Sequence, residues 1–238
     1  MNATESLPWF DEMQSQVARL PPDSNRARKW GESLVAVHFR VVYFAYHRDE
    51  FTRLIAEGLS HLPESEHDRD LIAAAFGERD AKQLSVNAVL ATAQLVAAAQ
   101  AIHAACDLFC RVAYWALALD TTALSLRLGS LNIDDLVKSS FGKSKVELER
   151  LRESDEFRYL VAFVNVNKHR HLLGDMPSLS LEGGVARGGL SIAEFQYGCG
   201  STVHEHPSRW AADFLAVDCE TVVDRLNGVG KALASDMV

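Results

Sequence analysis

The sequence predicts a mainly all-α protein: an up-down helical bundle of four to five core helices, with a small β-hairpin or meander inserted before the last helix. Three observations lead to this class. Apolar residues recur every three or four positions along most of the 238-residue chain, which is helical spacing. A stretch after Pro177 alternates apolar and polar residues, as strands do. No Pro/Gly/Ser-rich linker divides the chain, so one domain over residues 1–238 is expected.

The N-terminal part is expected to be an extension followed by a long helix. Residues 1–25 contain three prolines and form the extension, with a short helical piece over Trp9–Leu20. Helical spacing then runs from Ala27 to Leu59, and a shorter amphipathic helix is expected over Ser65–Phe76.

The longest helical pattern in the chain covers Asp80–Leu128. At 1.5 Å per residue it would span roughly 70 Å without interruption, so we expect a bend or a break. Its part Leu84–Cys106 carries no formal charge, which raises a membrane span as an alternative. Its Gln, Asn and His residues weaken insertion, and a helix buried inside a protein, with no membrane contact, is the preferred interpretation.

Three helices follow the long one. A short helix is expected over 132–141 and a charged helix over 144–153, opened by a capping box between Ser144 and Glu147. A central helix then starts at Ser154 or Asp155 and stops before Gly174.

The β insertion is expected over residues 178–198, as short strands around a turn at Gly183 and Gly184. A final amphipathic helix then covers Ser208–Ala234. Its inward-facing residues are expected to be Trp210, Phe214, Val217, Thr221, Val222 and Leu226.

A polar cluster closes the otherwise apolar central helix: Asn165, Lys168, His169 and Arg170. A helical projection puts Lys168 near the middle of the apolar side, where an unpaired ammonium costs several kcal/mol, so it must reach water or a carboxylate. Two interpretations stay open. The cluster caps the last turn, where each cation gains about 0.3–1 kcal/mol from the helix dipole, or it contacts a phosphate or nucleotide.

A second polar group lies on the long helix, where His103 and Asp107 are four residues apart and Arg111 follows one turn later. A buried carboxylate needs a partner. Either His103 supplies it within the helix, or Asp107 reaches across to Lys168 or His169.

Charge and cysteine usage restrict the function classes. A formal charge of −8 argues against a general basic field for nucleic acid, so any nucleic-acid contact must be local. Of the four cysteines, Cys106 and Cys110 are spaced i, i+4 on a helix, which suits a disulfide poorly. With no secretory leader recognised, we expect reduced thiols and a cytoplasmic location.

No metal site and no other cofactor is predicted. Cys199, His204 and His206 lie close in sequence and invite a zinc proposal, but three ligands without an obvious fourth do not match the usual spacings. Nucleophile elbows and metalloprotease helices are also absent from the sequence.

His103-x-x-x-Asp107 and the run from Ser154 to Leu172, above all Asn165-x-x-Lys168-His169-Arg170, resemble an uncharacterised bacterial branch of the HEPN superfamily. The resemblance covers roughly Val86 to the C-terminus. It implies a helical bundle, often dimeric, with the polar motif near the subunit or bundle centre.

The resemblance also implies a reaction, since active HEPN proteins are metal-independent ribonucleases that use an Arg and a His four to six residues apart at a shared dimer site. Here Arg158 and His169 are separated by ten residues. Arg40 and His47 have six between them but lie on another helix. The usual motif is therefore not found on the expected helix.

Two hypotheses of function follow. In the first, His169 is a general acid or base with an ordinary pKa of about 6.5, and neighbouring cations stabilise charge on an RNA phosphate. The catalytic candidates are His169, Arg170, Lys168 and His103. The binding or orienting candidates are Asn165, Asp107, Arg111 and Arg158. In the second hypothesis, the protein is a non-catalytic scaffold that binds RNA, a nucleotide or a protein partner, and the cluster is structural. Homodimerisation fits either, and a stress or phage-defence role rests on family analogy alone.

Overall fold

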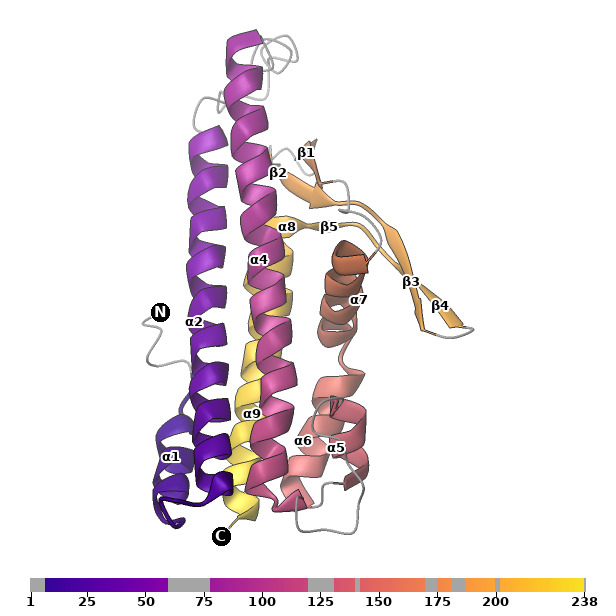
Figure 1. Ribbon diagram of the computed structural model, residues 1–238. Coiled ribbons are helices and arrows are strands. Elements are labelled where there is room, and N and C mark those ends of the chain that lie inside the picture. Colours follow the sequence, from indigo (N-terminus) through magenta and orange to yellow (C-terminus); the bar gives the residue numbers. More distant parts are fainter. Residues whose placement is uncertain are drawn as a thin grey trace. The chain divides into compact units, whose positions relative to one another are not determined.

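The computed structural model describes residues 7–59, 78–119, 131–139, 142–169, 175–180, 187–199 and 202–237 (Figure 1). These residues form a mainly helical protein with a small β region before the last helix, which confirms the predicted fold class. The helix predicted over Ser65–Phe76 lies outside the described residues.

The chain divides into two compact units. The first contains Met1–Ala45, Gln100–Val161 and Asp218–Val238, and the second contains Tyr46–Ala99 and Ala162–Val217. Each unit is therefore built from stretches that are far apart in sequence.

The first unit is a helical bundle. Its helices are α1 (Phe10–Ala18), parts of α2 (Asn25–Leu59), α4 (Glu78–Ala116) and α7 (Asp155–His169), and also α5 (Ile133–Ser139), α6 (Gly142–Glu153) and α9 (Glu220–Asp236). Helix α9 packs on α6 and on α1, and α5 packs on α6. Figure 1 shows α6 running beside α9.

Residues predicted to form an N-terminal extension take part in this core. Trp9 is only 1% exposed, and its ring meets Phe109 edge-on at 5.3 Å between centroids. Its indole Nε1 donates a hydrogen bond to Asn227 Oδ1 at 3.0 Å, on α9. A Cβ atom at Gly230 would lie 2.4 Å from the same ring, so the indole occupies the space that any larger residue at 230 would need.

Helix α4 has no break within its 39 residues and ends at Ala116, twelve residues before the predicted end. Ala118 has a φ of 53°, a left-handed conformation that stops helix propagation. The guanidinium of Arg26 donates hydrogen bonds to the carbonyls of Trp115 at 2.9 Å and Ala116 at 3.2 Å. These bonds satisfy carbonyls that a helix C-terminus leaves unpaired.

The capping box predicted at Ser144 is wrong, because α6 begins two residues earlier at Gly142, whose φ is 66°. The cap comes from Asp236 on α9. Its carboxylate accepts hydrogen bonds from the backbone amides of Lys143 at 3.2 Å and Ser144 at 2.7 Å. Burial alone would raise the pKa of this carboxyl, but the hydrogen bonds from Ser144 and Lys143 outweigh it and lower the pKa.

The predicted start of α7 is confirmed. Ser154 precedes the helix, and its hydroxyl accepts a hydrogen bond from the backbone amide of Phe157 at 3.2 Å. This is the arrangement of an N-cap residue.

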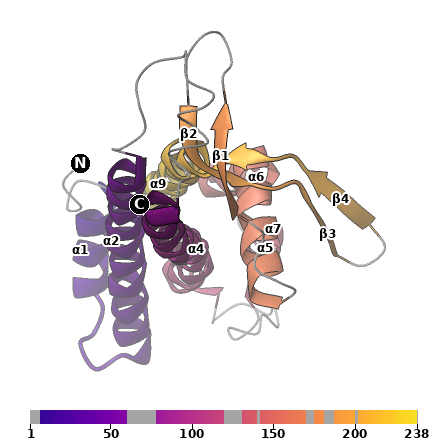
Figure 2. The ribbon, with the colours of Figure 1, turned by 90° about the horizontal axis from the view of Figure 1, so that it is seen from above.

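The second unit contains the strands. They are β1 (Asp175–Ser180), β2 (Arg187–Ile192), β3 (Phe195–Cys199), β4 (Thr202–His206) and β5 (Arg209–Trp210). The first sheet has the order β1-β2-β5, with antiparallel neighbours, and Figure 2 shows β1 beside β2. The second is the β3–β4 hairpin. The strands extend beyond the predicted range 178–198 on both sides, because backbone pairing recruits polar residues that do not look like a strand in sequence.

The last helical segment starts at Ala211 with a short helix α8 (Ala211–Asp213) and a π-helical stretch (Phe214–Cys219) that leads into α9. Because π-helical hydrogen bonds join residues five apart, Phe214 and Cys219 both face inward and are fully buried. Val217, predicted to face inward at α-helical spacing, is 58% exposed, so that prediction is wrong. Val222 and Leu226 are buried as predicted.

Among the described residues, one helical stretch, Val86–Ala116, is long and apolar enough to cross a membrane. A core helix passes the same test, and the residues Leu95, Ile102 and Phe109 of this stretch are almost fully buried in the protein. The stretch is therefore weak evidence for a membrane span.

Candidate interaction surface on helix α2

Helix α2 is apolar on two sides. One side holds Leu34, Val37, Val41 and Phe44, none of them more than 3% exposed. The other side carries Val35, Phe39 and Tyr43, which are 40%, 50% and 47% exposed. At 100° per residue these three side chains fall within about 80° of one another, together with Arg28 and Glu32. We call Val35, Phe39 and Tyr43 the α2 face.

The rings of the α2 face continue onto helix α1. Phe39 lies 6.2 Å from Tyr43 and 6.0 Å from His38, measured between ring centroids. His38 in turn lies 5.1 Å from Phe10 on α1. These contacts hold the exposed rings in place before any partner arrives, which lowers the entropy cost of binding.

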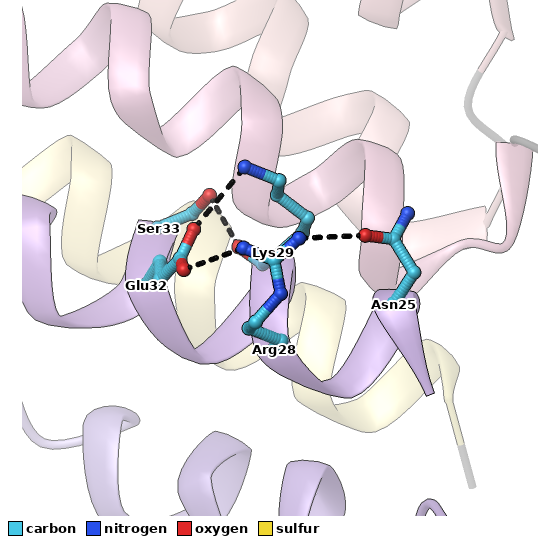
Figure 3. A network of polar contacts seen from close by, with 5 residues as sticks. All are labelled: Asn25, Arg28, Lys29, Glu32 and Ser33. Carbon is cyan, nitrogen blue, oxygen red and sulfur yellow. Dashed lines mark hydrogen bonds and ion pairs between the residues drawn. The ribbon is translucent and has the colours of Figure 1, made fainter. Parts of the chain in front are cut away.

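A polar network occupies the N-terminal end of the same helix (Figure 3). Arg28 bonds to Glu32 Oε1 and to Asn25 Oδ1, both at 2.9 Å, and Lys29 reaches Glu32 Oε2 at 3.4 Å. The Ser33 hydroxyl donates to the Lys29 carbonyl at 2.8 Å. The hydrogen bond from Arg28, assisted by Lys29, lowers the pKa of the Glu32 carboxyl. One carboxylate therefore serves two cations.

Arg40 lies next to the exposed rings and is itself exposed. Within the described residues its guanidinium makes no hydrogen bond or ion pair. At 100° per residue Lys29 and Arg40 project about 20° apart, so both lie along one edge of the α2 face. Arg40 therefore gives this edge a positive charge that the helix does not neutralise, while Lys29 is shared with Glu32.

The predicted pair on α4 forms within the helix. His103 Nδ1 lies 3.3 Å from Asp107 Oδ2, and the His103 side chain is 14% exposed while that of Asp107 is 63% exposed. Nδ1 nevertheless has no hydrogen-bond partner, so the two side chains lie close together without a hydrogen bond. Arg111, one turn further, is exposed. The premise that Asp107 is buried is wrong, because it is exposed to water. It has the intrahelical neighbour expected, and its reach to Lys168 or His169 stays a prediction.

The polar end of α7 is described only in part. Lys168 is exposed, so it reaches water despite its position on the helical projection, and Asn165 is half-buried. The side chain of His169 and the whole of Arg170 lie outside the described residues. Arg158 is exposed and lies 3.7 Å from Asp155 within its own helix.

The residues of the zinc alternative lie on the β3–β4 hairpin. His206 stacks on Phe195 with 4.9 Å between ring centroids and 16° between planes, while His204 is exposed. Burial, with His204 and Arg209 nearby, lowers the pKa of His206. Cys199 pairs with Thr202 in the register, but its side chain lies outside the described set. No group of three metal-binding side chains occurs in the part of the chain that the structure describes.

The α2 face was not predicted from the sequence. The signal was present, because Val35, Phe39 and Tyr43 repeat at intervals of four beside the inward row. A single buried stripe does not need this second row.

Comparison of the chain with protein-family models, with curated proteins and with solved structures gives no match. The resemblance to the HEPN superfamily therefore stays a prediction.

Proposed function

We propose that this chain is a helical interaction protein that binds a protein partner through the α2 face. The observation that carries the proposal is the continuous exposure of Val35, Phe39 and Tyr43 on one side of a helix. Tyr and Phe are enriched at protein interfaces, where a few buried aromatic anchors supply most of the binding energy. Contiguous apolar patches of a few hundred Å² occur on ordinary monomers and are often functional.

The size of the face sets the strength of binding. Each half-exposed ring offers on the order of 100 Å², and with Val35 the apolar area is roughly 250 Å². At about 25 cal/mol per Å² this area is worth on the order of 6 kcal/mol. Since association itself costs about 4–15 kcal/mol, the three side chains act as an anchor, and a stable complex needs further contacts around them.

The ribonuclease hypothesis makes a different demand on the molecule. It requires RNA cleavage that is lost in His169→Ala and Arg170→Ala variants of unchanged thermal stability. Substitutions in the α2 face should not affect that cleavage. In the interaction hypothesis these variants keep partner binding. Cys106, Cys110 and Cys219 are buried and not joined in disulfides, which supports our proposal of a reducing, cytoplasmic setting for either function.

Site-specific photocrosslinking in the native host tests the proposal. A crosslinking phenylalanine analogue replaces Tyr43 in one variant and Val146 in a control, because Val146 is similarly exposed at 46% but lies on α6. We expect a discrete crosslinked species from position 43 that Phe39→Ser removes, and none from position 146. Equal crosslinking at both positions, or none at position 43, would refute the proposal.

A further inference from the structure

We infer that the partner of the α2 face is an acidic amphipathic helix, an inference that rests on the proposed function. The first ground is charge. The protein as a whole carries a formal charge of −8, yet Glu32 is the one acidic residue between Asn25 and Arg48. The basic residues of that stretch are Arg26, Arg28, Lys29, Arg40 and Arg48.

Of these five cations, Arg40 alone makes no side-chain hydrogen bond or ion pair among the described residues, and Arg48 binds Asp49 at 2.8 Å. Arg26 is bound to carbonyls at the end of α4, and Arg28 holds Glu32 at 2.9 Å. Lys29 shares the same carboxylate at the longer distance of 3.4 Å, and Arg40 has no ionic partner among the described residues. A carboxylate on a partner would therefore pair with Arg40 directly, and a second carboxylate would share Lys29 with Glu32.

The second ground is spacing. From Val35 to Tyr43 the helix rises about 12 Å, which matches two turns of a partner helix with apolar residues at i, i+4 and i+7. Lys29 and Arg40 are separated by about 16 Å along the axis. A partner helix laid along α2 meets both cations when two acidic residues on its flank are about three turns apart.

A second copy of α2 fits less well. In an antiparallel pair related by a two-fold axis, equivalent edges of the two helices come to the same side. The Lys29 and Arg40 edge would then lie beside its own copy, and like charges would repel. The acidic partner removes this repulsion.

Single-stranded RNA also fits less well. It binds along a positive groove that follows many phosphates, with bases stacked on aromatic rings. The edge of the α2 face offers Arg40 and the shared Lys29, and the face includes the aliphatic Val35, on a protein of net negative charge.

Three synthetic helical peptides test the inference by fluorescence anisotropy on the full chain. They share one apolar row and differ at two flanking positions, eleven residues apart, which carry Glu, Gln or Lys. We expect the Glu peptide to bind about two- to fivefold more tightly per charge contact than the Gln peptide, with the Lys peptide weakest. Arg40→Glu should reverse this order, and Phe39→Ser should weaken every peptide at least tenfold.

The outcomes distinguish a failure of the acidic partner from a failure of the interaction surface itself. Equal binding of the Glu and Gln peptides, unchanged by Arg40→Glu but lost with Phe39→Ser, overturns the acidic partner and leaves the interaction surface intact. If no peptide binds, or if Phe39→Ser leaves peptide binding unchanged, both the acidic partner and the interaction surface are overturned. Sedimentation of the protein alone and titration with a uridine 20-mer complete the test. A dimer that Phe39→Ser abolishes, or RNA that competes with the Glu peptide, also overturns the acidic partner.

Discussion

Replacing Gly230 by alanine tests the packing of Trp9 against α9. Glycine to alanine inside a helix normally stabilises a protein by about 1 kcal/mol. At this position the new methyl carbon would lie 2.4 Å from three atoms of the Trp9 indole, far inside van der Waals contact. The buried ring must then move, and it would lose its edge contact with Phe109 and its hydrogen bond to Asn227.

The expected magnitude follows from these contacts. Removing a buried aromatic side chain costs about 3–5 kcal/mol, and the helix propensity of alanine returns about 1 kcal/mol. We expect Gly230→Ala to lower the free energy of unfolding by roughly 2–4 kcal/mol. The measurement is urea denaturation followed by circular dichroism at 222 nm.

Gly228→Ala is the matched control on the same helix. Its methyl carbon would lie 3.4 Å from Glu147 Oε2, the mobile end of a side chain, so we expect no loss of stability and a gain of up to about 1 kcal/mol. In a Trp9→Ala background, Gly230→Ala should also become stabilising, because the ring is gone. A Gly230→Ala protein as stable as wild type, or one equally destabilised with and without Trp9, would refute the reasoning.

Three further predictions concern helix ends. Asp236→Ala should cost about 1–2 kcal/mol at pH 7 in urea denaturation, and the difference from wild type should shrink at pH 3. The folded-state pKa of this carboxyl is lowered, so its contribution is present above the unfolded pKa and is lost as the pH falls through the folded value; equal loss at both pH values would contradict this. Ala118→Gly should raise the melting temperature measured by calorimetry, because φ of 53° costs a residue with a Cβ about 1–2 kcal/mol; a lower melting temperature would count against it. Ser154→Ala should lower the urea midpoint by an amount equivalent to about 1 kcal/mol, through loss of the α7 N-cap, whereas Ser154→Asp should retain most of the stability.

Local sequence pattern was enough to predict most of the helices. The predicted helix from Ala27 to Leu59 corresponds to α2 within two residues, because the buried row repeats at helical spacing. The start of α7 was also predictable, since an N-cap serine acts on amides only a few residues away.

The errors have causes that lie far apart in the chain. Helix α4 stops where Arg26, about ninety residues earlier in the sequence, binds its last carbonyls. The cap of α6 is Asp236, from the other end of the first unit. The exposure of Val217 follows from a π-helical turn, which leaves no simple signature in apolar spacing. These are tertiary contacts and backbone variations that a local pattern does not contain.

The candidate site was missed for a different reason, because its pattern is local but its exposure cannot be read from the pattern. Function was expected among the polar clusters, and the apolar pattern of α2 was used only to predict a helix. Side-chain exposure identifies Phe39 and Tyr43 instead. When a helix has two apolar rows, residue type alone does not show which row is buried by a neighbouring helix.

The scattered origin of the first unit has a consequence for biosynthesis. Its core joins Met1–Ala45 and Gln100–Val161 to a last stretch, Asp218–Val238, whose helix α9 packs on both α1 and α6. A nascent chain cannot close this core while α9 is still inside the ribosome exit tunnel. Trp9 therefore stays unburied until α9 has been synthesised, and during that time its exposed apolar surface is prone to aggregation.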